Sequence, residues 1–202
     1  MANRKGNLWS DPTGGDEVME WIARALQTPN ARITGVVYLL YFLTAISGSL
    51  FAGWPRLSLT VNLISTALYV ALTLLLYHLF KPVNKSLSLL AAFFSLAGCA
   101  ITALAFVDRA PSNISPLAFF GPFCLLVGYL IFRSTFLPRI LGVLMALAGL
   151  GWLAFLTALA NYLALYLKVL GFVAELSLMF WLITKGVNVQ RWKEQADAAN
   201  RA

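Results

Sequence analysis

Six long runs of apolar residues occupy the chain between about residues 33 and 185, separated by short polar or proline-containing breaks. A helix needs about 20 mostly apolar residues to cross the hydrocarbon core of a bilayer, and most of this chain divides into runs of that size. We therefore predict an all-α fold, a bundle of six transmembrane helices. Their expected ranges are about 33–53, 58–80, 86–107, 115–132, 139–160 and 163–185.

Proline and charged residues mark most of the breaks, as at Trp54-Pro55-Arg56 and Lys81-Pro82. The last break is only about Asn161-Tyr162, so we expect the fifth and sixth helices to form a close antiparallel hairpin. Small residues at helical spacing typically let two membrane helices approach closely. On the fifth helix this face is expected to consist of Gly142, Ala146 and Gly149.

Polar segments flank the predicted membrane domain of residues 33–185. Residues 1–32 are predicted to be a cytoplasmic tail, and residues 186–202 a cytoplasmic C-terminal tail. After Asp16, apolar residues recur at the spacing of one helical face. This pattern favours a short amphipathic helix lying on the membrane surface with Trp21 as its anchor; a frayed tail is the alternative.

Composition and charge support the same class of protein. Of the 202 residues, 60% are hydrophobic and 11% are charged, whereas soluble domains carry roughly 25% charged residues. If the chain crosses the bilayer six times, 12 of its 15 basic residues fall on one side. Basic loops mark the cytoplasmic side, so we predict both termini in the cytoplasm and a multi-pass protein of the bacterial inner membrane. The basic cytoplasmic segments then account for the net charge of +7, and no nucleic-acid partner is expected.

Glu175 is the only acidic residue within the six predicted spans. Acids inside a membrane domain face its interior or a wet cavity and find partners there. Lys168 lies two turns away on the same helix, about 10 Å along the axis. We expect Glu175 to be protonated much of the time and to bond an oxygen acceptor on the first or second helix. A structural buried acid and a proton- or ligand-binding acid both remain open.

Polar residues form a stripe on the second predicted helix. They recur on one face at the spacing of a 3.6-residue helix, so the stripe is expected to point into the bundle. Interhelical hydrogen bonding and a ligand cavity are the two interpretations. The stripe consists of Ser58, Asn62, Ser65, Thr66, Tyr69 and Thr73. We place a candidate ligand or proton site at Glu175 with Asn62, Thr66 and Tyr69.

Residues for conventional catalysis are scarce. His78 is the single histidine, and it excludes a multi-histidine metal site. No G-x-S-x-G motif occurs, and Cys99 and Cys124 both lie inside apolar runs. We therefore predict no enzyme activity, no metal and no cofactor.

A resemblance to a known family lies in the segment Gly128–Leu144, where Arg133, Pro138 and Arg139 surround a short turn. This segment resembles the hallmark of a bacterial membrane family, domain of unknown function 4386. Residues 31–35 and 175–188 resemble that family's opening and last helix. The resemblance implies a six-helix integral membrane protein and brings no activity with it.

The functional expectation follows from these features. We expect a membrane-embedded accessory subunit, or a protein that binds lipid or another hydrophobic ligand. Arg133 and Arg139 can meet lipid phosphates or a partner subunit at the surface, with Trp21 as a further anchor. The alternative is a small proton-coupled transporter that uses Glu175. Membrane lipids, and other membrane-protein subunits, are the expected partners.

Overall fold

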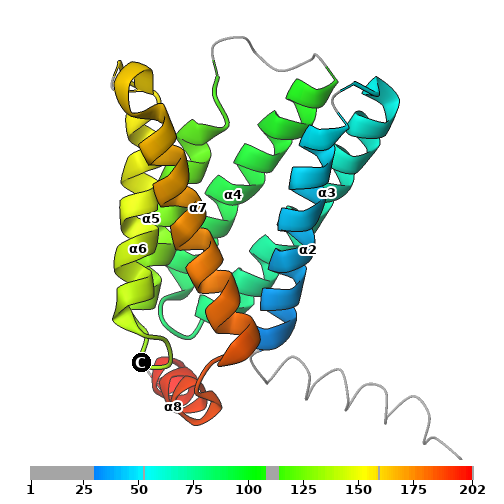
Figure 1. Ribbon diagram of the computed structural model, residues 1–202. Coiled ribbons are helices and arrows are strands. Elements are labelled where there is room, and N and C mark those ends of the chain that lie inside the picture. The colour runs from blue at the N-terminus through cyan, green and yellow to red at the C-terminus, as the bar shows by residue number, and fades with distance from the viewer. Residues whose placement is uncertain (1–29, 52, 108–113, 159, 202) are drawn as a thin grey trace, which may run out of the picture.

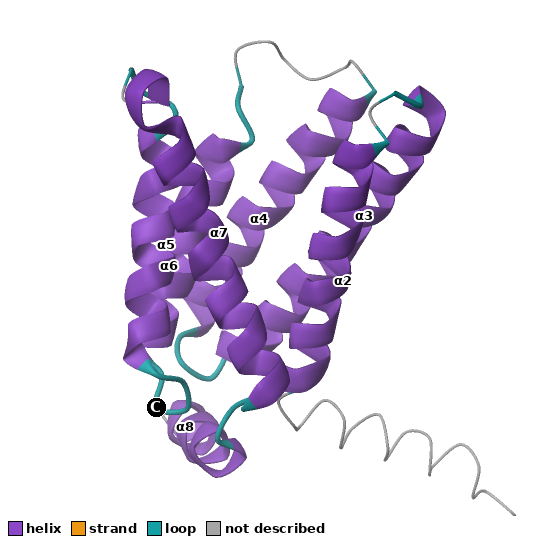
Figure 2. Cartoon of the chain, viewed as in Figure 1, coloured by secondary structure: helices purple, strands orange, loops and turns teal. Residues whose placement is uncertain are grey.

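The computed structural model describes residues 30–51, 53–107, 114–158 and 160–201, and all regular structure in these ranges is helical (Figures 1 and 2). The prediction of an all-α fold is confirmed there. The seven described helices are α2 (Ala31–Leu50), α3 (Pro55–Phe80), α4 (Lys85–Phe106), α5 (Leu117–Arg133), α6 (Arg139–Ala154), α7 (Ala160–Thr184) and α8 (Val189–Arg201). The predicted surface helix with Trp21 and the polar loop of residues 108–113 lie outside the described residues.

Four of these helices are long and apolar enough to cross a membrane: α2, α3, α4 and the Tyr162–Thr184 part of α7. The other two predicted spans correspond to shorter apolar helices, α5 with 17 residues and α6 with 16. The structure therefore shows membrane-type helices, four of them of full spanning length within the described residues.

The six apolar helices form a closed ring. Each of them from α2 to α6 packs on the next helix in the chain, and α7 returns to pack on α2. Gly35 of α2 lies so close to α7 that a β-carbon there would come within 2.8 Å of the Ile183 backbone nitrogen. From this contact the two helices diverge towards the opposite end of the molecule (Figure 1).

Glycines bring α5 and α6 into direct backbone contact. A β-carbon on Gly128 would lie 2.7 Å from the Gly142 carbonyl oxygen, and one on Gly149 would lie 2.8 Å from the Gly121 carbonyl oxygen. The predicted close-packing face of the fifth helix is confirmed at Gly142 and Gly149. Such small-residue contacts are typical of helix pairs in membranes, where van der Waals packing replaces the hydrophobic effect.

The end of α6 differs from the prediction. The helix stops at Ala154, a turn follows from residue 155, and α7 already begins at Ala160, so the expected two-residue joint at Asn161-Tyr162 is wrong. The chain tightens after the helix: the amides of Leu156 and Thr157 donate to the carbonyls three residues earlier, those of Leu153 and Ala154. Because the sequence stays apolar through this turn, hydropathy alone gave no break there.

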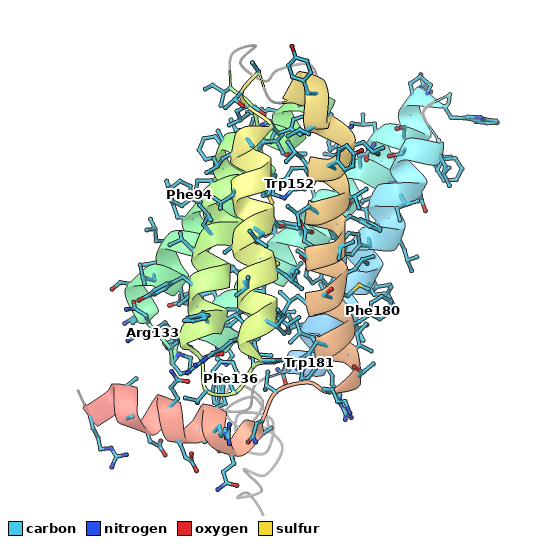
Figure 3. The ribbon with its side chains drawn as sticks, turned by 60° about the vertical axis from the view of Figure 1, so that its left-hand side comes forward. Phe94, Arg133, Phe136, Trp152, Phe180 and Trp181 are labelled. Atoms are coloured by element: carbon cyan, nitrogen blue, oxygen red, sulfur yellow. The ribbon has the colours of Figure 1, made fainter. Side chains whose placement is uncertain are left out.

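The polar segment after α7 contains a helix that the sequence analysis did not anticipate, α8, which lies across the end of the bundle (Figure 3). Gly186, with a positive φ of 66°, ends α7, and Asn188 accepts a bond from the Arg191 amide at the start of α8. The buried Trp192 indole donates to the Leu79 carbonyl at 2.9 Å. The last four carbonyls of a helix lack partners along it, so Trp192 satisfies one at the end of α3.

Basic residues gather at the α8 end of the molecule. The start of α2, the α3–α4 turn, the α5–α6 loop and the last turn of α7 meet there with α8, and most of the described lysines and arginines belong to these segments. They are Arg32, Lys81, Lys85, Arg133, Arg139, Lys185, Arg191, Lys193 and Arg201. Arg56 lies at the opposite end, and Lys168 lies in the first half of α7, the half farther from α8.

Candidate functional site

Glu175 lies in the middle of α7, on the side that faces α2 and α6. Its carboxyl oxygen accepts a hydrogen bond of 3.0 Å from the hydroxyl of Tyr38, a fully buried side chain of α2. The sequence predicted that Glu175 would donate to an oxygen acceptor on the first or second helix. The partner does lie on the first, α2, but the predicted direction is wrong, because Tyr38 donates and Glu175 accepts. Within the described residues, no lysine or arginine approaches Glu175 as an ion-pair partner.

Trp152 of α6 lies beside the same carboxyl group, and both residues line one pocket. Figure 3 shows Trp152 directed from α6 towards α7. Gly171 makes this possible, because a β-carbon there would lie 2.5 Å from the indole ring. Glu175 therefore has a hydrogen-bond donor on α2 and an aromatic neighbour on α6.

A pocket with a volume of about 410 Å³ opens beside Glu175, between α2, α6 and α7. This volume is in the range of small-molecule sites. Besides the acid, the wall is mostly aromatic, and the rings of Phe42 and Phe172 meet edge-to-face with centroids 5.5 Å apart. The lining residues are Tyr41, Phe42, Trp152, Lys168, Val169, Phe172 and Glu175.

Val169 and Phe172 line the pocket on α7, and both apolar side chains are about half exposed. On helices that cross a membrane, apolar side chains exposed in this way are contact sites for lipid. Lys168 also borders the pocket, and its ammonium group lies 5.7 Å from the centre of the Phe155 ring. The pocket thus has a positive charge at its border and an acid at its floor.

The structure brings Tyr69 close to this site and leaves Asn62 and Thr66 elsewhere. The buried Tyr69 packs edge-on against Tyr41, with ring centroids 4.7 Å apart. Asn62 fits against Gly48 and bonds the Ser58 hydroxyl, in the contact between α2 and α3. Thr66 bonds the Asn62 carbonyl of its own helix. A ligand role for Asn62, Thr66 and Tyr69 stays a prediction.

The polar stripe of the second predicted span points inward, as expected. Ser65, Tyr69 and Thr73 are buried, and the other three stripe residues are partly buried. The Thr73 and Ser95 hydroxyls lie 2.6 Å apart and link α3 to α4. This part of the stripe therefore forms interhelical hydrogen bonds, the first of the two interpretations.

Arg133 and Arg139 are exposed at the basic end, on either side of the α5–α6 loop. Arg139 lies over the Phe132 ring at 5.5 Å. The loop between the arginines packs on α8: Gln195 accepts bonds from both the amide and the hydroxyl of Thr135. Lipid or partner docking at these arginines stays a prediction, and the third docking residue, Trp21, lies outside the described residues.

Several residues in the pocket or next to Glu175 were not anticipated from the sequence: Tyr38, Tyr41, Phe42, Trp152 and Phe172. A signal existed for three of them, because Tyr38, Tyr41 and Phe42 have the i, i+3, i+4 spacing of one helical face. No sequence signal connected them to Trp152 or Phe172, since that proximity arises only when α2, α6 and α7 pack together.

No cluster of three potential metal ligands occurs among the described residues.

Fold and site together define the class: a helical protein with membrane-type helices and an aromatic pocket that contains one acid. The chain belongs to the family described as domain of unknown function 4386 (DUF4386), whose profile matches residues 52–110 and 112–186. It is also similar to an uncharacterized protein of Archaeoglobus fulgidus, with 31% identity over 123 residues, covering 58% of this chain and 76% of the relative. The relative is archaeal, so the likeness is not confined to bacteria. No solved structure matches the chain.

Proposed function

We propose that this chain is an integral membrane protein that binds a small hydrophobic molecule in the pocket between α2, α6 and α7. The observation that carries the proposal is the pocket itself, about 410 Å³ with aromatic walls and the Glu175 carboxyl at its floor. Ligand sites are typically apolar and hold a few well-placed polar groups that orient the ligand. Here Glu175, held by Tyr38 and Trp152, has that role.

The topology we propose has six membrane crossings, with both ends of the chain on the cytoplasmic side. At 1.5 Å per residue, α5 and α6 are about 24–26 Å long, somewhat less than the ~30 Å hydrocarbon core. Local thinning of the bilayer accommodates such a mismatch at modest cost. The glycine contacts between α5 and α6 favour a pair that crosses together, and the basic α8 end favours the cytoplasmic side. The inner membrane of a bacterium is the location we propose.

The proposed partners of the outer surface are membrane lipids. Arg133 and Arg139 are exposed at the basic end, where anionic headgroups attract juxtamembrane arginines. A role as accessory subunit of a larger membrane complex is compatible with the same surface.

Identification of copurified small molecules tests the binding proposal. The protein is purified in a mild detergent, and the extract is analysed by mass spectrometry for three forms: wild type, Val169→Trp and Leu165→Trp. Val169 borders the pocket, so the larger ring fills it. Leu165 lies one turn away on the same helix and is 70% exposed, which makes it the matched control.

We expect one enriched hydrophobic compound in wild type and in Leu165→Trp, and its loss from Val169→Trp. Equal amounts in all three forms would place the compound outside the pocket and contradict the proposal. The absence of any enriched compound from wild type would contradict it as well.

A second candidate function is proton-coupled transport through Glu175. The observation in its favour is the mid-helix carboxyl at the floor of an open pocket, bonded to Tyr38 across the α2–α7 contact. In liposomes this function predicts proton uptake driven by a substrate gradient, abolished by Glu175→Gln. Ligand binding without proton movement would reject transport and leave the binding proposal intact.

A further inference from the structure

We propose that the Glu175 pocket is selective for hydrophobic organic cations, molecules with one substituted ammonium group on an apolar body. This inference rests on the proposed binding function and specifies its ligand class. Three features of the pocket support this inference: an acid that has no cationic partner, the aromatic walls, and the position of Lys168.

The acid supplies the selectivity for charge. Glu175 is the single acidic residue of the described apolar helices, and no lysine or arginine pairs with it there. Its neighbours Tyr38 and Trp152 are neutral, and the bond from the Tyr38 hydroxyl orients the carboxyl without neutralising it. An ionised acid away from water is costly unless a cation accompanies it. A ligand ammonium group is the cation that the pocket itself lacks.

The aromatic walls suit the same group. Tyr41, Phe42, Trp152 and Phe172 line the pocket around the carboxyl. The faces of aromatic rings attract cations, and substituted ammonium ions are typical ligands of such aromatic sites. The apolar substituents of the ammonium group meet the rings while its charge meets Glu175.

Lys168 argues against the opposite choice, an anionic amphiphile. The Lys168 ammonium lies over the Phe155 ring, is largely exposed, and stands two turns from Glu175. A long lysine side chain at such a position can keep its charge in a polar environment, so it needs no ligand anion. An anionic ligand that paired with Lys168 would also have to place the rest of the molecule next to Glu175. The charge of Glu175, and not that of Lys168, therefore selects the charge of the ligand.

Cation binding at this site is expected to compete with a proton. A protonated carboxyl group offers a ligand cation no counter-charge, so the cation binds best to the ionised acid. The titratable groups around Glu175 are Tyr38 and Tyr41 on α2, Tyr69 on α3, Cys124 on α5 and Lys168 on α7. Phenols and thiols are ordinarily neutral and lysine ordinarily charged near neutral pH. Glu175 is then the group whose change of charge the ligand senses.

Three probes of equal shape test the inference on the full-length protein in detergent. They are phenylbutyl-trimethylammonium, its neutral isostere with carbon in place of nitrogen, and phenylbutylsulfonate as the anion. Affinities are measured by titration calorimetry for wild type, Glu175→Gln, Lys168→Met and Glu194→Gln. Glu194 lies on the exposed surface of α8, so its variant removes one carboxylate far from the pocket and serves as the control.

We expect wild type and Glu194→Gln to bind the cation at least about tenfold more tightly than the neutral isostere. Glu175→Gln removes this preference, and Lys168→Met strengthens cation binding because a repelling charge is gone. Affinity for the cation rises with pH in wild type and is independent of pH in Glu175→Gln. Thermal unfolding shows whether each variant is folded.

Equal affinity for the cation and its isostere in wild type would overturn the inference, and so would tighter binding of the anion. Failure of all three probes to bind would overturn it too. The copurification experiment with Val169→Trp does not depend on ligand charge, so it decides separately whether the pocket binds a hydrophobic molecule. If Glu175→Gln does not fold, the Lys168→Met comparison still tests the sign of the charge preference.

Discussion

At the scale of single residues, the contact between Tyr38 and Glu175 connects helices that are far apart in the sequence. The bond is 3.0 Å long and joins residues 137 positions apart. Side-chain hydrogen bonds between membrane helices contribute only about 0.6 kcal/mol on average. Bonds to charged groups contribute about 1.5–3 kcal/mol. Tyr38 is fully buried, so we place this bond above the membrane average.

A double-mutant cycle measures the Tyr38–Glu175 interaction. We expect Tyr38→Phe to destabilise the protein by about 1–3 kcal/mol, because the carboxyl loses a buried donor. In Glu175→Gln the same change costs less, with a coupling energy of about 1 kcal/mol or more. Equilibrium unfolding in mixed micelles gives these values. The control is Tyr129→Phe, since Tyr129 is 48% exposed; it should be additive with Glu175→Gln. Additivity for Tyr38→Phe as well would contradict the contact.

The sequence was sufficient to single out Glu175, because an acid within a long apolar run is conspicuous by type and depth. It was not sufficient to identify the neighbours of that acid. Tyr38 and Trp152 are ordinary aromatic residues of membrane-type helices, and each points at Glu175 only because of how α2, α6 and α7 are rotated. The polar stripe was equally visible, yet Asn62 stabilises the α2–α3 contact and lies apart from the pocket.

At the scale of helices, the contact between α5 and α6 depends on glycine. Gly142 and Gly128 allow the two backbones to touch, with a β-carbon on Gly142 only 2.7 Å from the Gly128 carbonyl oxygen. A rigid backbone cannot move aside as a flexible side chain does. The spacing of small residues predicted this face, because small residues at helical intervals have few other uses in a membrane helix.

Substitution of two glycines on α6 tests this contact. Gly142→Ala should destabilise the protein by about 1–3 kcal/mol, the usual cost of overpacking. Gly151→Ala is the matched control, because the nearest atoms to a β-carbon there are 3.7 Å away, an ordinary contact distance. Thermal unfolding in one detergent should show a lower Tm for Gly142→Ala alone. Equal Tm values for the two variants would contradict a tight backbone contact.

Helix ends were harder to predict than helix faces. The α6–α7 turn begins at residue 155, in a stretch of sequence that remains largely apolar, so no polar break marked it. The helix α8 was missed for the opposite reason, because its low hydrophobicity resembles that of a tail. Its signals were present in the capping residue Asn188 and in Trp192 and Ala196, which lie four residues apart on the face that packs on the core. Tertiary contact with Leu79 gives that face its partner.

At the scale of the whole molecule, the pocket is a consequence of ring closure. The packing of α7 on α2 completes the ring, tight at Gly35 and Ile183 and open where the helices diverge. The number and order of apolar helices followed from hydropathy. The closure of α7 onto α2 did not, because sequential spacing says nothing about which distant helices meet. The pocket exists only through that long-range contact.

The most direct test of this account is the reactivity of Glu175 towards two carbodiimides. These reagents add the O–H of a protonated carboxyl group across a C=N bond, and dicyclohexylcarbodiimide reaches acids from lipid whereas a cationic, water-soluble carbodiimide reaches them from water. Peptide mass mapping of the protein in membranes identifies the modified residue. Glu194, exposed on α8, reports on the water-soluble reagent. The account predicts that dicyclohexylcarbodiimide modifies Glu175, that Val169→Trp suppresses this, and that the water-soluble reagent modifies Glu194 and spares Glu175. Modification of Glu175 by the water-soluble reagent alone, or no protection in Val169→Trp, would contradict a lipid-facing pocket with this acid at its floor.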